Sequence, residues 1–284
     1  MAEGGGAPPA EAVRGVKGVS SLIAIVVAVV TFLAGLGVGA LFLAPAPAPE
    51  LPRLLLGTNT PFPPFEYYNT TTNALEGFDI ELIQTLVTRA GYSYEWRDFR
   101  DFSALLYAVA AEGVDVAIGA ITMNGPVGEE RNKTLKFTDP YYEADQGVLK
   151  RASDTTNYCA ATDCTVEELN KTNLKVGVQA ITTSEYWAAD QLKNVELTTY
   201  PDVAQVLQAL QAGTVDIVII DLPAAQGISA ANPAFAVEGT IQTDELYAFA
   251  TAKDDPKALI PKLNSALASV KADGTYQRLL DKYF

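Results

Sequence analysis

The chain has 284 residues, of which 49% are hydrophobic and 19% charged, a composition typical of a folded protein large enough for two lobes. Its 34 acidic and 20 basic side chains give a net charge of −14, which argues against a nucleic-acid-binding surface. The sequence has no histidine, only two cysteines and no glycine-rich nucleotide loop. This excludes a Ser-His-Asp triad, an imidazole base and the usual zinc sites, so we expect neither a metal nor a cofactor.

An uncharged stretch lies near the N-terminus, and its central part, residues 22–43, is a run of 22 residues that are almost all apolar. At about 1.5 Å per residue, a helix of this length spans the ~30 Å hydrocarbon layer of a membrane. We therefore predict a transmembrane anchor over residues 19–43 rather than a short cleaved signal or a buried core helix. Arg14 and Lys17 precede the span, which places a short tail, residues 1–18, in the cytoplasm and the remaining chain outside.

The anchor is followed by an alternation of Ala and Pro, which gives an extended linker over residues 44–52. The folded part that follows is acidic and is expected to be extracytoplasmic. Cys159 and Cys164 can form a disulfide in an oxidising setting, or can be two free thiols. Three triplets match the glycosylation sequon, although such triplets are also common by chance; they begin at Asn69, Asn132 and Asn170.

One segment of the chain occurs twice in similar form. Residues 105–118 read LLYAVAAEGVDVAI, and residues 206–219 read VLQALQAGTVDIVI. Each predicts a helix, a turn at Gly and a short buried strand, and each follows an earlier apolar strand, at residues 54–57 and 174–178. Alternating strands and helices predict two α/β lobes with mostly parallel sheets and a cleft between them.

A further amphipathic helix is expected over residues 80–90, with Asp79 as its N-cap and Gly91 just past its end. Ligands of open α/β sheets bind beyond the carboxyl ends of strands, so the loops at those positions are expected to hold the site. They carry an ordered series of motifs: Pro63-Pro64-Phe65, Gly77-Phe78-Asp79-Ile80-Glu81-Leu82, Phe102, Ile121-Thr122 with Glu130-Arg131, Phe137-Thr138-Asp139-Pro140-Tyr141-Tyr142, Lys175-Val176-Gly177-Val178-Gln179, Asp221-Leu222-Pro223, and Gly274-Thr275-Tyr276 with Lys282-Tyr283-Phe284.

This series resembles the extracytoplasmic solute-binding proteins of polar amino-acid ABC importers, and most of all the glutamine-binding and basic amino-acid-binding proteins. The resemblance covers residues 53–284 and implies the two-lobed α/β periplasmic-binding-protein fold (type II, Venus-flytrap). It places the first part of lobe 1 at residues 53–146, lobe 2 at 147–240 and the return to lobe 1 at 241–284. Two strands are expected to cross between the lobes near residues 146–150 and 235–241.

Several residues suit the two charges of a free amino acid. Arg131 can hold a carboxylate with its planar guanidinium, and Thr182 and Thr183 begin a predicted helix whose free N–H groups favour an anion. Asp221, at the end of a strand, can accept the ammonium group, and the resemblance implies these same roles. The hydroxyl of Thr122 and the carbonyl of Ala120 can add hydrogen bonds to the ammonium.

The resemblance also implies which residues surround the ligand side chain: Phe62 and Phe102 flank it, and Asn59 and Gln179 contact its far end. Because Asn59 and Gln179 are neutral and Ile220 is apolar, we predict a neutral polar ligand such as glutamine. We expect the partners to be ABC permease subunits with a separate ATPase, and no nucleic acid.

Three features depart from the family pattern. The stretch between Thr122 and Arg131 is longer than usual, so Arg131 is expected to enter from a shifted loop. Ile181 replaces a glycine, and a β-branched residue disfavours a positive φ. The lipid-attachment cysteine is replaced by the predicted membrane helix, an arrangement that resembles archaeal cell-surface binding proteins.

Two other functions are compatible with the fold. One is an enzyme, either a cyclohexadienyl or prephenate-type dehydratase or a lytic-transglycosylase-like protein, which needs a carboxyl group of raised pKa in the cleft. Glu66 is the candidate for that carboxyl, although it also fits a structural role beside Phe65. The other is a ligand-sensing receptor domain, which we disfavour because no second membrane span or output domain follows the predicted lobes.

Overall fold

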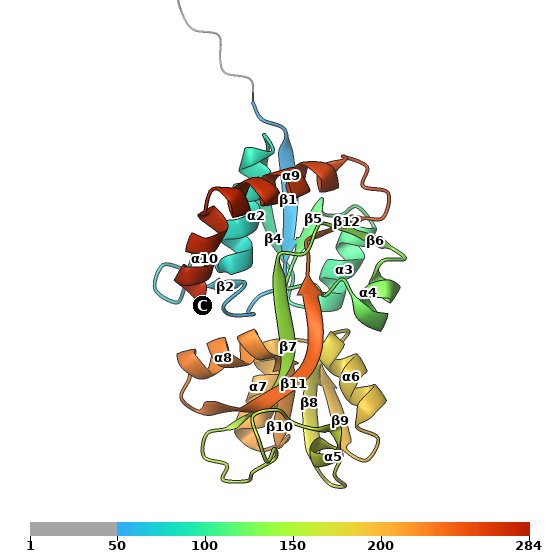
Figure 1. Ribbon diagram of the computed structural model, residues 1–284, viewed down its shortest axis with the longest axis vertical. Helices are drawn as coiled ribbons and strands as arrows, with labels where there is room; N and C mark the ends of the chain where they lie inside the picture. Colours follow the sequence, from blue (N-terminus) through green and yellow to red (C-terminus); the bar gives the residue numbers. More distant parts are fainter. Residues whose placement is uncertain (1–49) are drawn as a thin grey trace, which may run out of the picture. The chain divides into compact units, whose positions relative to one another are not determined.

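The computed structural model describes residues 50–284, of which residues 51–284 form one compact unit (Figure 1). The predicted cytoplasmic tail and membrane anchor lie outside these residues, as does most of the Ala/Pro linker. In the part of the chain that the structure describes, every helix is too short or too polar to cross a membrane.

Within residues 50–284 the first large sheet has a mixed order of strands. Parallel pairs join β1 to β4 and to β5, whereas β12 runs antiparallel to both of its neighbours. In spatial order the strands are β4 (Ser93–Asp98), β1 (Arg53–Thr58), β5 (Val116–Ile118), β12 (Ala250–Ala252) and β6 (Leu135–Phe137).

The second large sheet of the described chain is also mixed. Strand β8 is parallel to β10 and β9, whereas β7 is antiparallel to β10 and β11. In spatial order the strands are β11 (Phe235–Tyr247), β7 (Tyr142–Arg151), β10 (Ile217–Asp221), β8 (Lys175–Gln179) and β9 (Glu196–Tyr200). The prediction of mostly parallel sheets is therefore wrong: β7 and β12 enter their sheets from the other lobe and β11 leaves for it, so these strands need no helical crossover and pair antiparallel.

Helices pack on the two sheets, and a short hairpin of β2 (Tyr67–Tyr68) and β3 (Leu75–Glu76) precedes the first helix. The helices of the described residues are α2 (Phe78–Arg89), α3 (Phe102–Ala110), α4 (Gly125–Arg131), α5 (Val166–Leu169), α6 (Thr183–Gln191), α7 (Val203–Ala212), α8 (Leu222–Ala231), α9 (Leu259–Ala272) and α10 (Thr275–Tyr283).

The repeated segment has the predicted structure in both places, as α3 followed by β5 and as α7 followed by β10. Its aspartate has the same contact in each copy. Asp115 Oδ2 accepts a hydrogen bond from the backbone N–H of Leu55 (2.9 Å), and Asp216 Oδ2 accepts one from the N–H of Lys175 (3.0 Å). The Val-Asp pair therefore ties each repeated unit to the strand beside it.

The helix predicted over residues 80–90 begins two residues earlier, and its N-cap is Gly77, so the assignment of Asp79 as N-cap is wrong. Asp79 lies in the first turn and is fully buried. Its Oδ2 accepts hydrogen bonds from the N–H of Ala120 (3.0 Å) and from the hydroxyl of Tyr141. The buried carboxyl group of Asp79 therefore points towards the sheet, where its hydrogen bond with Ala120 holds the backbone of that residue.

Several motif residues pack in one aromatic cluster of the first lobe. The ring of Phe65 is fully buried and meets the rings of Phe78, Tyr142 and Tyr247 edge to face. Phe284 stacks on Tyr142 at 4.9 Å between ring centroids. Much of the motif series thus holds the core together rather than facing the cleft.

Two long strands, β7 and β11, pass between the sheets (Figure 1). Residues 235–241 pair with residues 146–151, inside the second sheet, and residues 245–247 pair with residues 142–144 after a shift in register. The segments expected to cross, 146–150 and 235–241, therefore belong to the second sheet. The passage lies at residues 142–145 of β7 and 242–247 of β11.

Candidate functional site

A cavity of about 30 Å³ is lined by residues that follow strands of both sheets. All ten residues that sequence analysis proposed for ligand contact line it: Asn59, Phe62, Phe102, Ala120, Thr122, Arg131, Gln179, Thr182, Thr183 and Asp221. Other lining residues include Glu66, Ser184 and Ile220. The structure thus brings together groups of opposite charge, aromatic rings and amides in one concave site.

Arg131 is the last residue of α4, and its side chain lines the cavity. The long stretch after Thr122 forms this helix rather than a shifted loop, and Gly128 lets the helix approach the backbone of Met123 closely. The guanidinium is buried and donates hydrogen bonds to the carbonyl oxygens of Thr122 (3.0 Å) and Ile181 (3.2 Å). Because Ile181 follows a strand of the second sheet, Arg131 spans the cavity.

Burial lowers the pKa of Arg131 to about 10, and the carboxyl groups of Glu245 and Asp221 oppose that shift. The guanidinium therefore stays positively charged at neutral pH. It lies 5.4 Å from the centroid of the Phe102 ring, a distance suited to a cation–π contact.

The N-terminus of α6 faces the same cavity. Thr182 is its N-cap and accepts a hydrogen bond from the N–H of Glu185 (3.3 Å). The N–H groups of Thr183 and Ser184 have no acceptor among the described residues. Ile181 adopts a φ of +63° despite its β-branched side chain, and its N–H donates a hydrogen bond to the Glu185 carboxylate (2.6 Å). This turn presents free N–H donors, which suit an anion.

Asp221 ends β10 and is buried. Its oxygens accept hydrogen bonds from Gln146 Nε2 (2.6 Å) and from the Tyr247 hydroxyl. Burial raises the pKa of the Asp221 carboxyl to about 7, and the nearby Glu245 adds to the rise, while the hydrogen bonds from Tyr247 and Gln146 oppose it. A cation placed in the cavity would favour the charged carboxylate.

The amides of Asn59 and Gln179 meet within the cavity. Gln179 Nε2 donates to Asn59 Oδ1 (3.3 Å), and Asn59 Nδ2 donates to the carbonyl of Phe99 (2.6 Å). Since Asn59 follows β1 and Gln179 ends β8, this contact joins the two sides of the cleft. The remaining predicted residues have less specific contacts: Phe62 stacks on Phe65, and Ala120 contributes backbone at a φ of +46°.

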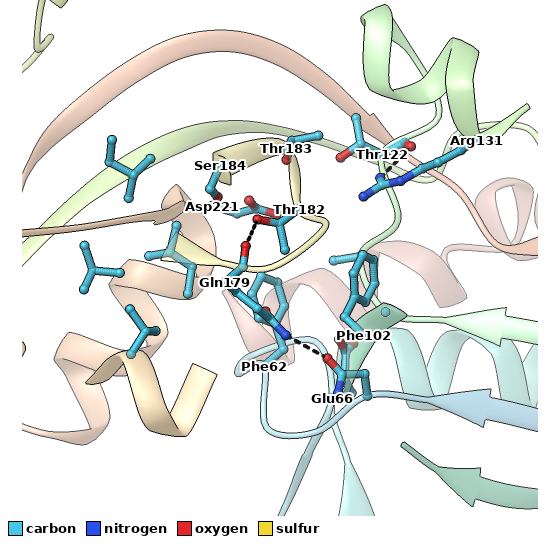
Figure 2. A pocket seen from close by; sticks show the side chains of 17 residues that line it. Phe62, Glu66, Phe102, Thr122, Arg131, Gln179, Thr182, Thr183, Ser184 and Asp221 are labelled. Carbon is cyan, nitrogen blue, oxygen red and sulfur yellow. Dashed lines mark hydrogen bonds between the residues drawn. The ribbon is translucent and has the colours of Figure 1, made fainter. Parts of the chain in front are cut away.

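Glu66 was proposed only for the rival enzymatic function, yet it lines the cavity and is 1% exposed. Figure 2 shows its side chain near those of Phe62 and Phe102. Its Oε2 has no hydrogen-bond partner among the described residues. Burial raises the pKa of Glu66 well above its ordinary value, and the charges of Asp79, Asp221 and Asp98 add to the rise. The sequence signal for it was a lone acid after an aromatic loop.

Gln146, Glu245 and Tyr247 were missed because they lie behind the cavity rather than on it. They occupy the crossing strands β7 and β11, and the available signal was a pair of polar residues, Gln146 and Glu245, inside otherwise strand-like runs.

Other predicted features lie away from the cavity. Cys159 and Cys164 are joined by a disulfide. Asn132 is exposed, whereas Asn69 and Asn170 are half-buried and their side-chain oxygens accept backbone hydrogen bonds. Residues 50–284 hold no cluster of three or more Cys, Asp or Glu side chains suited to a metal ion.

Residues 54–284 match the family described as bacterial extracellular solute-binding proteins, family 3. The ABC transporter arginine-binding protein 1 of Escherichia coli K12 is 30% identical over 82% of this chain and 90% of its own length. An ancestral arginine-binding protein bound to glutamine is 30% identical, with a TM-score of 0.73 over 82% of this chain and 97% of its own. The same kind of protein bound to arginine is 30% identical, with a TM-score of 0.71 over 82% and 98%.

Proposed function

Because the chain belongs to the bacterial extracellular solute-binding proteins, family 3, we propose that it captures a free amino acid in the cleft between Arg131 and Asp221. Like its relatives, it is a binding protein of an ABC transporter and not an enzyme. The observation that carries the proposal is the pair of buried opposite charges on one cavity, supplied by different sides of the cleft.

The ligand carboxylate is proposed to bind between Arg131 and the start of α6. The guanidinium supplies a planar, permanently charged donor, and the N–H groups of Thr183 and Ser184 supply uncommitted donors nearby. On binding, the carboxylate would replace the Ile181 carbonyl as a partner of Arg131. The carboxylate would then link Arg131 on one side of the cleft to the start of α6 on the other.

The ammonium group is proposed to bind at Asp221. A carboxyl group whose pKa is raised by burial gains most from an incoming cation, because the cation offsets the loss of hydration. The Thr122 hydroxyl and the Ala120 carbonyl lie on the same cavity and complete the set of acceptors in this proposal.

For the ligand side chain, we favour arginine. Glu66 lines the cavity with a buried carboxyl oxygen that lacks a partner, and a guanidinium would supply both the missing donors and a compensating charge. Arginine is also named for the Escherichia coli relative. Glutamine, predicted from the neutral amides of Asn59 and Gln179, is the second candidate, and a solved relative holds it.

We further propose that residues 19–43 anchor the chain and that its binding lobes comprise residues 53–146 with 241–284 and residues 147–240, apart from residues 146 and 241, which pair within the second sheet. Closure of the lobes about β7 and β11 buries the ligand. The loaded lobes then dock on ABC permease subunits whose separate ATPase drives transport.

Isothermal titration calorimetry of the purified chain with the common L-amino acids tests the proposal. We expect arginine to bind most tightly and Glu66→Gln to weaken arginine at least tenfold, about 1.4 kcal/mol, while glutamine is little affected. Glu167→Gln, at an exposed position outside the cavity, is the matched control. Binding of glutamine without arginine would reassign the side-chain pocket, and binding of no amino acid would overturn the function.

A further inference from the structure

The acceptor proposed for the ammonium is held by the two crossing strands. Gln146 on β7 donates to Asp221 Oδ1, and Tyr247 on β11 donates to Asp221 Oδ2. Within residues 50–284, no other side chain donates a hydrogen bond to this carboxyl group. The orientation of Asp221 therefore depends on the same strands that join the two lobes.

The amide of Gln146 has only one workable orientation. It is fully buried, and its Nε2 lies 2.6 Å from Asp221 Oδ1 and 2.7 Å from Glu245 Oε1, so its two hydrogens serve two carboxyl groups, with a longer contact to Thr183 Oγ1 at 3.2 Å. Its Oε1 accepts from the Ser184 hydroxyl at 2.6 Å. Rotating the amide by half a turn would place its oxygen against both carboxyl groups, which is electrostatically unfavourable.

Glu245 extends this cluster to the other side of the cleft. It is buried, and its Oε2 accepts a hydrogen bond from the Thr122 hydroxyl at 2.5 Å. Thr122 follows β5 of the first sheet, whereas Asp221 ends β10 of the second. The chain of contacts Thr122–Glu245–Gln146–Asp221 thus runs from one lobe to the other through residues of β7 and β11.

We propose that Gln146 and Glu245 are positioning residues that set the orientation and charge of Asp221 for the ligand ammonium and so couple its binding to the arrangement of the crossing strands. Neither residue lines the cavity, so each acts through cavity residues that it contacts: Gln146 through Asp221, Thr183 and Ser184, and Glu245 through Thr122. This proposal rests on the proposed function, because it concerns the ammonium half of that site.

The two residues affect Asp221 in opposite directions. Gln146 stabilises the carboxylate form by donating a hydrogen bond, whereas Glu245 disfavours that form by its negative charge. The other groups acting on this carboxyl are Tyr247, which donates a hydrogen bond, Arg131, which attracts it, and Glu66, whose carboxyl group lines the same cavity and repels it when charged. Removal of Gln146 and removal of Glu245 should therefore shift the pH midpoint of ligand affinity in opposite directions. A mere loss of packing would not produce opposite shifts.

The test is the affinity for the tightest-binding amino acid between pH 4 and 9, measured by calorimetry on the full chain in a Glu66→Gln background, because ionisation of Glu66 in the same cavity would otherwise add to the pH dependence. We expect affinity to rise with pH as Asp221 ionises, with the midpoint shifted upward in Gln146→Met and downward in Glu245→Gln, each by at least about half a pH unit. Gln179→Met removes a buried glutamine that lines the cavity without contacting Asp221; it changes the affinity through its contact with Asn59 but should leave the midpoint unchanged.

Reduced affinity with unmoved midpoints in both variants would overturn the positioning role. If Gln146→Met does not fold, Glu245→Gln alone decides, since it keeps the size of the side chain and removes only the charge. Asp221→Asn separates the two levels of inference. Wild-type affinity in that variant would contradict the ammonium site itself, whereas a large loss there with unmoved midpoints elsewhere would reject only the roles of Gln146 and Glu245.

Discussion

At the scale of single residues, Arg131 and Asp221 are held in different ways. Arg131 donates to backbone carbonyl groups on both sides of the cavity, whereas Asp221 accepts from side chains of the crossing strands. A guanidinium can keep one of these carbonyl contacts while a second edge binds a carboxylate, which a single ammonium cannot do with the same geometry.

Arg131→Lys should therefore weaken amino-acid binding at least tenfold, about 1.4 kcal/mol, although the charge is kept. Titration calorimetry on the folded variant measures this. Lys133→Ala, at an exposed position two residues further on, should bind as the wild type does. An Arg131→Lys variant of unchanged affinity would be incompatible with recognition of a carboxylate by the planar group.

Asp79 allows a prediction about stability. Burial raises its pKa from 3.8 to about 7, against hydrogen bonds from Tyr141 and Ala120 that lower it. Between those values the folded chain binds more protons than the unfolded chain, so this group makes the free energy of unfolding fall as pH rises from about 4 to about 7. Asp79→Asn should flatten that fall, because an amide does not ionise in this pH range. Its oxygen can still accept both hydrogen bonds, so the fold is kept.

Urea denaturation without ligand at several pH values between 4 and 7 measures the effect. Asp254→Asn, at an exposed position, should retain the wild-type slope. An equally steep fall in Asp79→Asn would show that this carboxyl group is not responsible.

The sequence was informative about which residues meet but less so about their surroundings. All ten proposed residues line one cavity because the motif series fixes which loops follow the sheet strands. The burial of Asp79, the unpartnered oxygen of Glu66 and the positive φ of Ile181 depend on packing between segments far apart in the chain. No local pattern encodes such contacts, and glycine preference alone wrongly disfavoured the turn at Ile181.

At the scale of elements, α4 decides where Arg131 lies. A Cβ added to Gly128 would stand 2.1 Å from the carbonyl carbon of Met123, a contact that only displacement of the backbone can relieve. The helix can therefore approach Met123 only with glycine at this position, and any shift of the helix moves the guanidinium at its end.

Gly128→Ala should consequently lower both affinity and stability, by about 1–3 kcal/mol in the free energy of unfolding. Calorimetry and urea denaturation measure the two effects. Glu129→Ala changes the next, exposed residue of the same helix and should alter neither. Wild-type binding in Gly128→Ala would mean that α4 can move without carrying Arg131 away.

Elements with strong periodicity were predicted well, including both copies of the helix–turn–strand unit. Strand direction was predicted less well, because the sequences of strands such as β7 and β12 do not indicate whether their partners run parallel or antiparallel. The segments expected to cross were placed too far into the second sheet for a similar reason: β7 and β11 each run through the crossing as one strand, and the register shift between Ile241 and Glu245 depends on their pairing rather than on local sequence.

At the scale of the whole molecule, the two-lobed α/β fold expected from the motif series agrees with the similarity to solved binding proteins, apart from the mixed sheets. Contacts across the cleft are both polar and apolar: Arg131 donates to the Ile181 carbonyl, Gln179 donates to Asn59, and Phe62 packs against the hydrophobic cluster of the second lobe. A ligand that binds groups of both lobes in the folded state alone stabilises that state by mass action.

A ligand at a hundred times its dissociation constant should raise the free energy of unfolding by about 2.7 kcal/mol. Urea denaturation with and without the tightest-binding amino acid measures this. Arg131→Ala at the same ligand concentration should gain little, because one half of the clamp is lost. Equal stabilisation of that variant would indicate binding elsewhere on the protein.

Translation delivers the chain N-terminus first. β12 lies between β5 and β6 in the first sheet, but in the sequence it comes after both of them and after all strands of the second sheet. Until residue 252 has left the ribosome, the facing edges of β5 and β6 have no partner between them, and unpaired edges favour aggregation. The strands of the second sheet, β7 to β11, are consecutive, so that lobe is complete earlier. The nascent protein therefore finishes its second lobe before its first.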